Sequence, residues 1–165
     1  MPTDPDIPDI DPASLDWSQR VADIDAIRKV NPHRYEVELL TAITHLDPAR
    51  KFIAGFKDAT DQEFWVRGHM PGFPLMPGVL MCEAAAQLCA FYVVSQGVVK
   101  DTMMGLGGIE TAKFRRMVRP GDRLLLVGHG LKVDRRLTRF HVRGYVGWEQ
   151  AFETIVVGVP LKTGS

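Results

Sequence analysis

The segment 68–94, GHMPGFPLMPGVLMCEAAAQLCAFYVV, constrains the fold more than any other part of the chain. Three prolines between positions 71 and 77 each remove a backbone donor and fix φ, so residues 67–78 cannot form regular structure. Residues 79–94 follow with only Glu83 and Gln87 as polar side chains. The preceding Pro-Gly suits a helix start, and Ala, Leu and Met favour a helix. A helix that is apolar on all sides must be buried, and this one is too short to span a membrane, so the sequence predicts a stiff loop leading into a central helix.

Strand-like runs occupy most of the remaining chain. Residues 16–34 predict a short amphipathic helix with apolar side chains at three-residue steps. Alternating or β-branched runs bounded by turn signals then predict strands over 35–46, 50–59, 103–118, 123–133, 137–146 and 151–159. The last four runs are separated by short turns, which indicates a meandering antiparallel sheet. One long buried helix and about six strands predict an α+β fold in which the sheet wraps the helix.

The N-terminal segment 1–16 differs in composition from the rest of the chain. It holds four prolines and five aspartates, which is typical of an extended or disordered acidic tail. It lacks the basic-then-apolar pattern of a signal peptide, so we expect a cytoplasmic protein. The whole chain has 165 residues, enough for one domain of ordinary size, which we place at 17–165.

The formal net charge is zero, which gives no support to a general nucleic-acid coat or a membrane-surface role. The charge is nevertheless uneven, because residues 113–143 hold 10 basic residues against Asp122 and Asp134. These arginines and lysines are either solvated strand ends or a surface that meets an acidic partner or a phosphate. Cys82 and Cys89 lie about 10 Å apart along a helix, beyond disulfide reach, and are expected to be buried apolar groups in a reducing compartment.

Glu83 and Gln87 are separated by one helical turn and therefore share one face of the predicted helix. A carboxylate there is costly to bury unless it is paired or protonated, so one interpretation is a structural pair with an arginine or a loop cap. The other is catalytic, because His69 precedes Glu83 in a loop stiff enough to aim it. Such a pair suits an elimination in which histidine takes the α-proton of an activated acyl group. A carboxylic acid whose pKa is raised by desolvation would then protonate the departing hydroxyl.

The intermediate enolate of such an elimination needs hydrogen-bond donors. Free N–H groups at a helix start supply them, and Gly78 and Val79 stand at that position. Gln87 is expected to hold Glu83 or a bound water by a hydrogen bond. No zinc spacing, P-loop, nucleotide fingerprint or serine elbow occurs, so the predicted chemistry needs no cofactor.

The run GHMPGFPLMPGVLMCEAAAQ resembles the signature of the 3-hydroxyacyl-[acyl-carrier-protein] dehydratases with the hot-dog fold, the FabZ type. IDAIRKVNPHRY resembles the family's opening helix and Pro-His-Arg step, and IETAKFRRMVRPGDRLLL its strand and turn after the central helix. The resemblance covers about residues 24–160. It implies dehydration of (3R)-3-hydroxyacyl thioesters to trans-2-enoyl thioesters in fatty-acid biosynthesis or a related pathway.

By position, the resemblance places the catalytic histidine on His69 and the catalytic acid on Glu83. It places the amide that polarises the thioester carbonyl at Gly78 or Val79, and the orienting glutamine at Gln87. It also implies homodimers, often assembled into hexamers, in which the two catalytic groups of one site come from different subunits. The acyl chain would lie in a tunnel at that interface, reached by the phosphopantetheine arm of an acyl carrier protein.

Several other residues receive weaker expectations. Basic residues such as Arg115, Arg116 and Arg119 could meet the acidic carrier. Arg67, Met70 and Phe73 depart from the family's usual residues and leave the acyl-chain length and the carrier open. His129 and His141 are expected on strand faces rather than as metal ligands, and Trp65 and Trp148 in the core or the tunnel lining. A non-catalytic acyl-thioester-binding protein and an acyl thioesterase on the same fold remain as alternatives.

Overall fold

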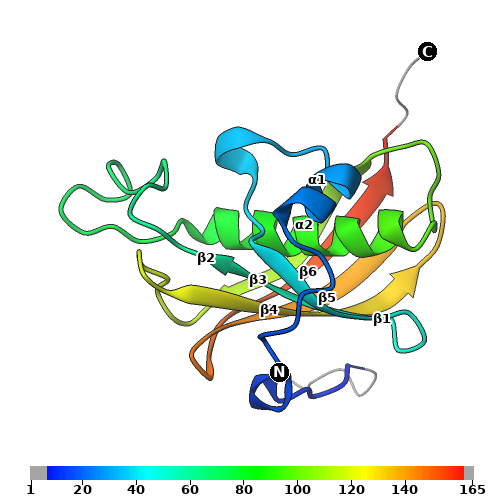
Figure 1. The fold of residues 1–165 in the computed structure, drawn as a ribbon, viewed down its shortest axis with the longest axis horizontal. Coiled ribbons are helices and arrows are strands. Elements are labelled where there is room, and N and C mark those ends of the chain that lie inside the picture. The colour runs from blue at the N-terminus through cyan, green and yellow to red at the C-terminus, as the bar shows by residue number, and fades with distance from the viewer. Residues whose placement is uncertain (1–6, 162–165) are drawn as a thin grey trace.

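A six-stranded antiparallel sheet wraps around one long helix in the computed structural model, which describes residues 7–161 (Figure 1). The helix is α2, Gly78–Ser95. The other elements are η1 Pro12–Ser14, α1 Ile24–Val30, η2 Tyr35–Val37, β1 Ala42–Asp47, β2 Phe52–Asp58, β3 Met104–Phe114, β4 Arg123–Val133, β5 Thr138–Val146 and β6 Glu149–Pro160. The predicted α+β class and the hot-dog arrangement implied by the resemblance are confirmed.

The strand order β1-β2-β4-β5-β6-β3 differs in one respect from the predicted meander. Strands β4, β5 and β6 follow one another as predicted, but β3 pairs with β6 at the edge rather than with β4. The connection from β3 to β4 therefore crosses between strands that are not neighbours, and backbone hydrogen bonds hold it at both ends. Arg115 and Arg116 donate their backbone N–H groups to the carbonyl of Ala151, and Ala59 bonds to Asp122. The consequence is that β3 has a free edge within the described part of the chain.

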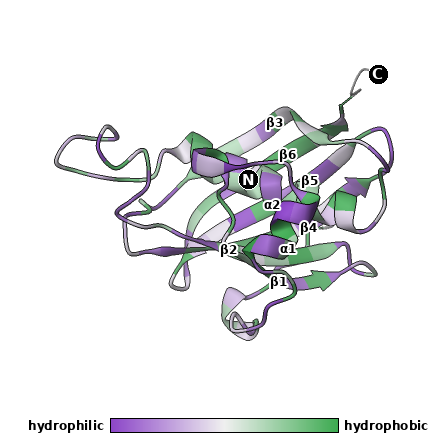
Figure 2. Ribbon diagram, turned by 45° about the horizontal axis from the view of Figure 1, so that its top comes forward, coloured by the Kyte–Doolittle hydropathy of each residue, from purple (hydrophilic) through white to green (hydrophobic). Residues whose placement is uncertain are grey.

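Helix α2 is the core of the domain. Ten of its residues are buried, and the strands around it carry both apolar and polar residues (Figure 2). A Cβ at Gly55 would lie 2.6 Å from the carbonyl of Ala42 and 3.1 Å from Leu88, so glycine lets β2 approach the helix. The sequence predicted a helix over 79–94 that was too short to span a membrane. The observed α2 is longer, and by length and composition alone it could cross one. Its burial inside the sheet identifies it as a core helix.

Two predicted elements are shorter than expected. Of the helix predicted over 16–34, only α1 is observed. It begins after Asp23, whose side chain caps it by accepting a hydrogen bond from the N–H of Ala26 at 2.9 Å. Before that cap, the backbone N–H groups of Val21 and Ala22 donate to the carbonyl of Ile43. Val21, which is one of the apolar residues at three-residue steps in the predicted helix, is 53% exposed. The strand predicted over 35–46 begins only at residue 42, because η2 occupies its first part.

Residues 10–17 lie on the face of the sheet that points away from α2 (Figure 1). Ile10, Leu15 and Trp17 pack there against a second apolar cluster made of Ala42, Phe52, Ala54, Phe56, Leu125, Val127 and Tyr145. Positions 1–6 of the predicted tail lie outside the described residues.

Candidate active site

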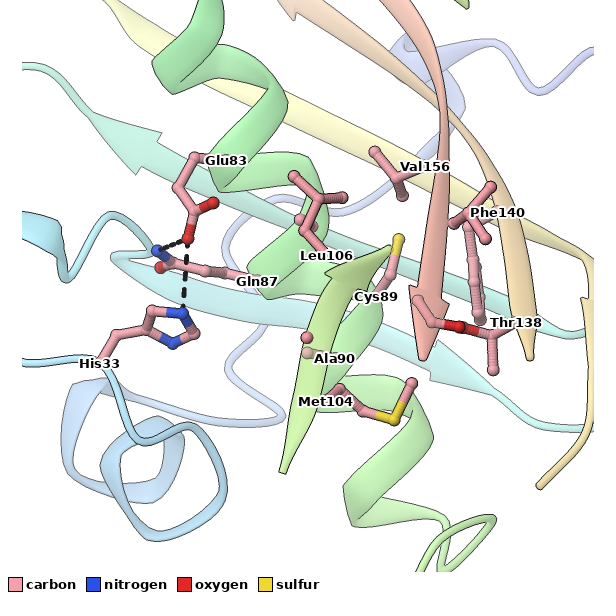
Figure 3. Close-up of a pocket in the computed structure, with 14 residues that line it drawn as sticks. His33, Glu83, Gln87, Cys89, Ala90, Met104, Leu106, Thr138, Phe140 and Val156 are labelled. Atoms are coloured by element: carbon pink, nitrogen blue, oxygen red, sulfur yellow. Dashed lines mark hydrogen bonds and ion pairs between the residues drawn. The ribbon is translucent and has the colours of Figure 1, made fainter. Parts of the chain in front are cut away.

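Glu83 lies in the second turn of α2, and its side chain is 31% exposed. The side-chain amide of Gln87 donates a hydrogen bond to Oε1 of Glu83 at 2.9 Å. The ring of His33 approaches the same oxygen, with Nε2 at 3.4 Å (Figure 3). Both contacts fall on one carboxyl oxygen, Oε1.

Gln87 is buried and connects the carboxyl group to the rest of the domain. Its Nε2 also donates to the carbonyl of Val37 at 2.7 Å, and its Oε1 accepts the N–H of Leu39 at 3.1 Å. Its own backbone carbonyl accepts a hydrogen bond from the side chain of Asn31 at 2.9 Å. Both amide hydrogens and the amide oxygen are therefore used, so Gln87 orients Glu83 rigidly.

The pKa of Glu83 shifts in the opposite direction to the prediction. Burial raises the pKa, but hydrogen bonds from His33 and Gln87, together with the charge of His33, leave it below its usual value. The prediction of a raised pKa was wrong because it considered desolvation alone and assigned no donor to Glu83 besides Gln87. The structural alternative of an arginine partner is also not realised, since the partners are a histidine and a glutamine.

A narrow cavity of about 50 Å³ opens beside Glu83, between α2 and one end of β3, β5 and β6. We call it the Glu83 cavity. His33, Glu83 and Gln87 form its polar end (Figure 3). The rest of the wall is largely apolar and includes Ala86, Ala90, Met104, Leu106, Phe140 and Val156. The polar end and the apolar walls together are typical of the lining of small-molecule sites.

His69 is held by the stiff loop that the sequence predicted, and no helix or strand occurs between residues 67 and 77. Its backbone N–H donates to the carbonyl of Trp65 at 2.7 Å, and its carbonyl accepts the N–H of Leu75 at 2.9 Å. The ring Nδ1 lies 2.8 Å from the carbonyl oxygen of Leu75, which can only accept. The proton therefore sits on Nδ1, and Nε2 keeps the lone pair that a general base requires.

His69 does not line the Glu83 cavity within one chain. Its loop extends past the start of α2, away from that cavity (Figure 1). The two residues that the sequence assigned to one reaction therefore occupy separate places in the described part of a single chain.

The start of α2 borders a second hollow, a groove of about 510 Å³. Gly78 and Val79 line it together with Phe114, Arg115, Arg116 and Met117. No side chain of the described residues caps this helix end, so its first N–H groups stay available. A Cβ at Gly78 would lie 2.9 Å from the ring of Phe114, so a side chain there would displace that half-exposed ring.

Many of the basic residues of 113–143 pair with carboxylates. These pairs include Arg115–Glu153, Arg116–Glu149, Arg123–Asp58, Arg139–Glu110 and Arg143–Asp9. Arg119 instead lies over the ring of Phe73 at 4.6 Å, in the loop that holds His69. Solvated, paired strand ends therefore account for much of this charge.

The histidines, tryptophans and cysteines singled out in the sequence lie where they were predicted, with the exception of Trp148. His129 and His141 lie on strand faces as predicted, directly opposite each other in β4 and β5. Trp65 is buried as predicted, but Trp148 is 62% exposed because it lies in the turn between β5 and β6. Both cysteines are free and buried, and burial raises the pKa of each thiol.

His33 is the residue of the site that the sequence reasoning missed. The Pro-His-Arg step containing it was part of the resemblance, yet no role was assigned to it. It lies far before Glu83 in the sequence and gives no local sign of the contact, since only the tertiary fold joins the two.

Comparison with known proteins gives consistent results. A family profile described as a FabA-like domain matches residues 31–154. A 3-hydroxyacyl-[acyl-carrier-protein] dehydratase FabZ from Desulforamulus reducens is 38% identical over 131 residues, covering 79% of this chain and 92% of that protein. The FabZ of Clostridium botulinum strain Loch Maree is 42% identical over 137 residues, covering 83% of this chain and 88% of that protein. Among solved structures, the dehydratase heterocomplex ApeI:P from Xenorhabdus doucetiae has a TM-score of 0.71 at 12% identity, covering 83% of this chain and 91% of that chain, and this similarity shows the shared fold.

Proposed function

Because the chain belongs to the FabA-like domain family, we propose that it dehydrates (3R)-3-hydroxyacyl thioesters of acyl carrier protein to trans-2-enoyl thioesters in fatty-acid biosynthesis. The observation that carries this proposal is the carboxyl group of Glu83 at the polar end of an apolar cavity, with one oxygen held by Gln87. Relatives that share 37–42% of their residues with this chain carry that dehydratase name. The reaction is a carbon–oxygen elimination.

In this mechanism Nε2 of His69 takes the proton from Cα of the acyl group. The C–O bond at C3 then breaks, and the departing hydroxyl leaves as water with the proton of Glu83. The turnover ends with protonated His69 and ionised Glu83, which exchange their protons with solvent. Since the pKa of Glu83 is low in the free protein, the acid form must be favoured when the acyl chain fills the cavity and removes water from the carboxyl group.

The start of α2 stabilises the enolate in this mechanism. The N–H of Gly78, or that of Val79, donates to the thioester oxygen as negative charge develops there. The partial positive charge of the helix N-terminus adds to this stabilisation. The exposed position of Val79, at 73%, and the groove beside it leave room for the thioester.

The protein works as a homodimer, with a trimer of dimers as a further assembly. The free edge of β3 can pair with the same edge of a second copy, and apolar side chains along it are exposed, including Leu106 and Ile109. Pairing there supports a site in which His69 of one subunit reaches Glu83 of the other, because His69 does not line the Glu83 cavity of its own chain.

The acyl carrier protein is the partner that delivers the substrate. Arg115 and Arg116 line the groove at the start of α2, and the guanidinium group of Arg119 lies over a ring in the His69 loop. All three can therefore meet an acidic surface close to the reacting groups. Two buried, free cysteines suit a reducing compartment such as the cytoplasm.

Following enoyl-thioester formation by ultraviolet absorbance tests the activity directly. His69→Ala and Glu83→Ala should each lower kcat by about 10²-fold or more. Wild-type turnover in both variants would contradict the assignment of roles. Release of free thiol, detected with a trapping dye, would indicate a thioesterase instead, and tight binding without turnover would indicate a binding protein.

Mixing the two inactive variants tests whether a site spans two subunits. Random reassociation gives half mixed dimers, each with one intact site out of two, so roughly a quarter of wild-type activity should return. A mixture of His69→Ala with the double variant His69→Ala/Glu83→Ala contains no intact site and is the matched control. No recovery in the first mixture would place both groups in one chain.

A further inference from the structure

The imidazole of His33 contacts the carboxyl group of Glu83 from a part of the chain that the mechanism above does not use. Its Nε2 lies 3.4 Å from Oε1 of Glu83, and its ring lines the Glu83 cavity (Figure 3). Nδ1 of the ring is buried and has no hydrogen-bond partner among the described residues. Because Nδ1 faces no acceptor, the ring proton is better placed on Nε2, where Glu83 accepts it.

The loop that presents His33 is held in place by its neighbours. The guanidinium group of Arg34 donates to the carbonyls of Asn31, His33 and Arg28, at 2.9, 2.6 and 2.8 Å. Asn31 is buried and donates to the backbone of Gln87, which ties the loop to α2. The contact between His33 and Glu83 is therefore part of a fixed arrangement rather than a chance approach of two surface groups.

Three charged groups next to this loop, Arg28, Arg34 and Glu38, already have partners. Arg34 is bonded to backbone carbonyls, and Glu38 forms a two-point ion pair with Arg28. Glu83 on α2 is thus the charged group that faces the imidazole among the described residues.

We propose that His33 is a positioning residue for the elimination: with Gln87 it occupies Oε1 of Glu83, so that Oε2 carries the proton given to the departing hydroxyl. This inference rests on the proposed dehydration. Two N–H donors on one carboxyl oxygen disfavour protonation of that oxygen, and they also stop the carboxyl group from rotating. A proton held in one place, facing the cavity, shortens its path to the leaving group.

Loss of His33 has two separable effects. The carboxyl group keeps only the hydrogen bond from Gln87, so the transferring proton is less well placed and kcat falls. Burial of Glu83 is then opposed by fewer interactions, so its pKa rises. A residue that merely filled space would not lower kcat separately from KM, and it would not move the basic limb of the pH profile.

The experiment compares His33→Ala and His33→Gln with the wild type, measuring kcat, KM and kcat/KM from mildly acidic to mildly basic pH. His33→Ala should lower kcat by about tenfold or more, with KM changed by less than about threefold, and should move the basic limb of the kcat profile, which Glu83 sets as the acid, to higher pH. His33→Gln keeps an N–H donor and should recover most of kcat. His129→Ala, which alters a partly buried histidine outside the Glu83 cavity, is the matched control and should leave kcat unchanged.

Wild-type kcat and an unchanged pH profile in a folded His33→Ala would overturn the proposal. If that variant does not fold, His33→Gln decides: a folded glutamine variant with kcat lowered tenfold or more overturns it. A wild-type protein that dehydrates no hydroxyacyl thioester would refute the proposed function instead. Titration of the Glu83 carboxyl carbon by NMR then still reports on the contact, since replacing His33 by alanine removes a donor to Glu83 and must raise its pKa.

Discussion

Replacing Gln87 with leucine tests how far the carboxyl site also supports the fold. Leucine has a similar volume and suits α2, but it removes three side-chain hydrogen bonds: those to Leu39, Val37 and Glu83. Leu39 is only 1% exposed, so its N–H cannot turn to water after the change. Val37 is 50% exposed, so its carbonyl can be hydrated instead.

The magnitude follows from which groups stay buried. An unsatisfied buried N–H at Leu39 costs about 1–3 kcal/mol, and each of the other two lost bonds contributes about 0.5–1 kcal/mol because water can partly replace it. The free energy of unfolding should therefore fall by about 2–5 kcal/mol. The same variant should lose activity, because Glu83 loses the partner that orients it.

Urea unfolding followed by circular dichroism, at fixed protein concentration, measures this change as a lower midpoint with an unchanged slope. The control is Gln96→Leu, an exposed position at the end of the same helix, which should change stability by no more than about 0.5 kcal/mol. A loss below about 1 kcal/mol for Gln87→Leu would show that Leu39 finds another partner, and the reasoning from buried hydrogen bonds would be refuted.

Three further outcomes are expected. Gly78→Ala should lower kcat, because its Cβ meets the half-exposed ring of Phe114 at 2.9 Å and displaces it beside the helix start. An alanine variant with wild-type kcat would contradict this. Desolvation raises the pKa of Glu153, but His141 and neighbouring arginines outweigh it and hold that pKa below its usual 4.5. Ionised Glu153 therefore stabilises the folded protein above pH 4.5, and this contribution is lost as the pH falls through the lowered pKa. In urea unfolding from neutral to acidic pH, the free energy of unfolding should fall less steeply for Glu153→Gln than for the wild type. An identical pH dependence in the two proteins would count against a lowered pKa at Glu153. Because burial raises the pKa of Cys89 strongly, a thiol reagent at mildly basic pH should label it only after unfolding, and fast labelling of the native protein would show that the core opens.

Local patterns in the sequence predicted the parts of this protein that depend on short-range physics. Closely spaced prolines exclude a helix or strand wherever they occur, so the stiff loop of His69 followed from the chain alone. The helical period likewise placed Glu83 and Gln87 on one face, and their hydrogen bond follows from that spacing. Turn signals placed β4 at its observed ends, Arg123 and Val133.

Long-range contacts were decided only by the tertiary structure. The place of β3 at the sheet edge depends on how the connection after it is bonded to Ala151, and no periodicity records that bond. The direction of the pKa shift of Glu83 depends on His33, which lies much earlier in the chain and meets the carboxyl group only after folding. Sequence spacing fixes which side chains share an element, but a pKa is set by the groups that surround a side chain in space, and these come from elements that only the folded chain brings together.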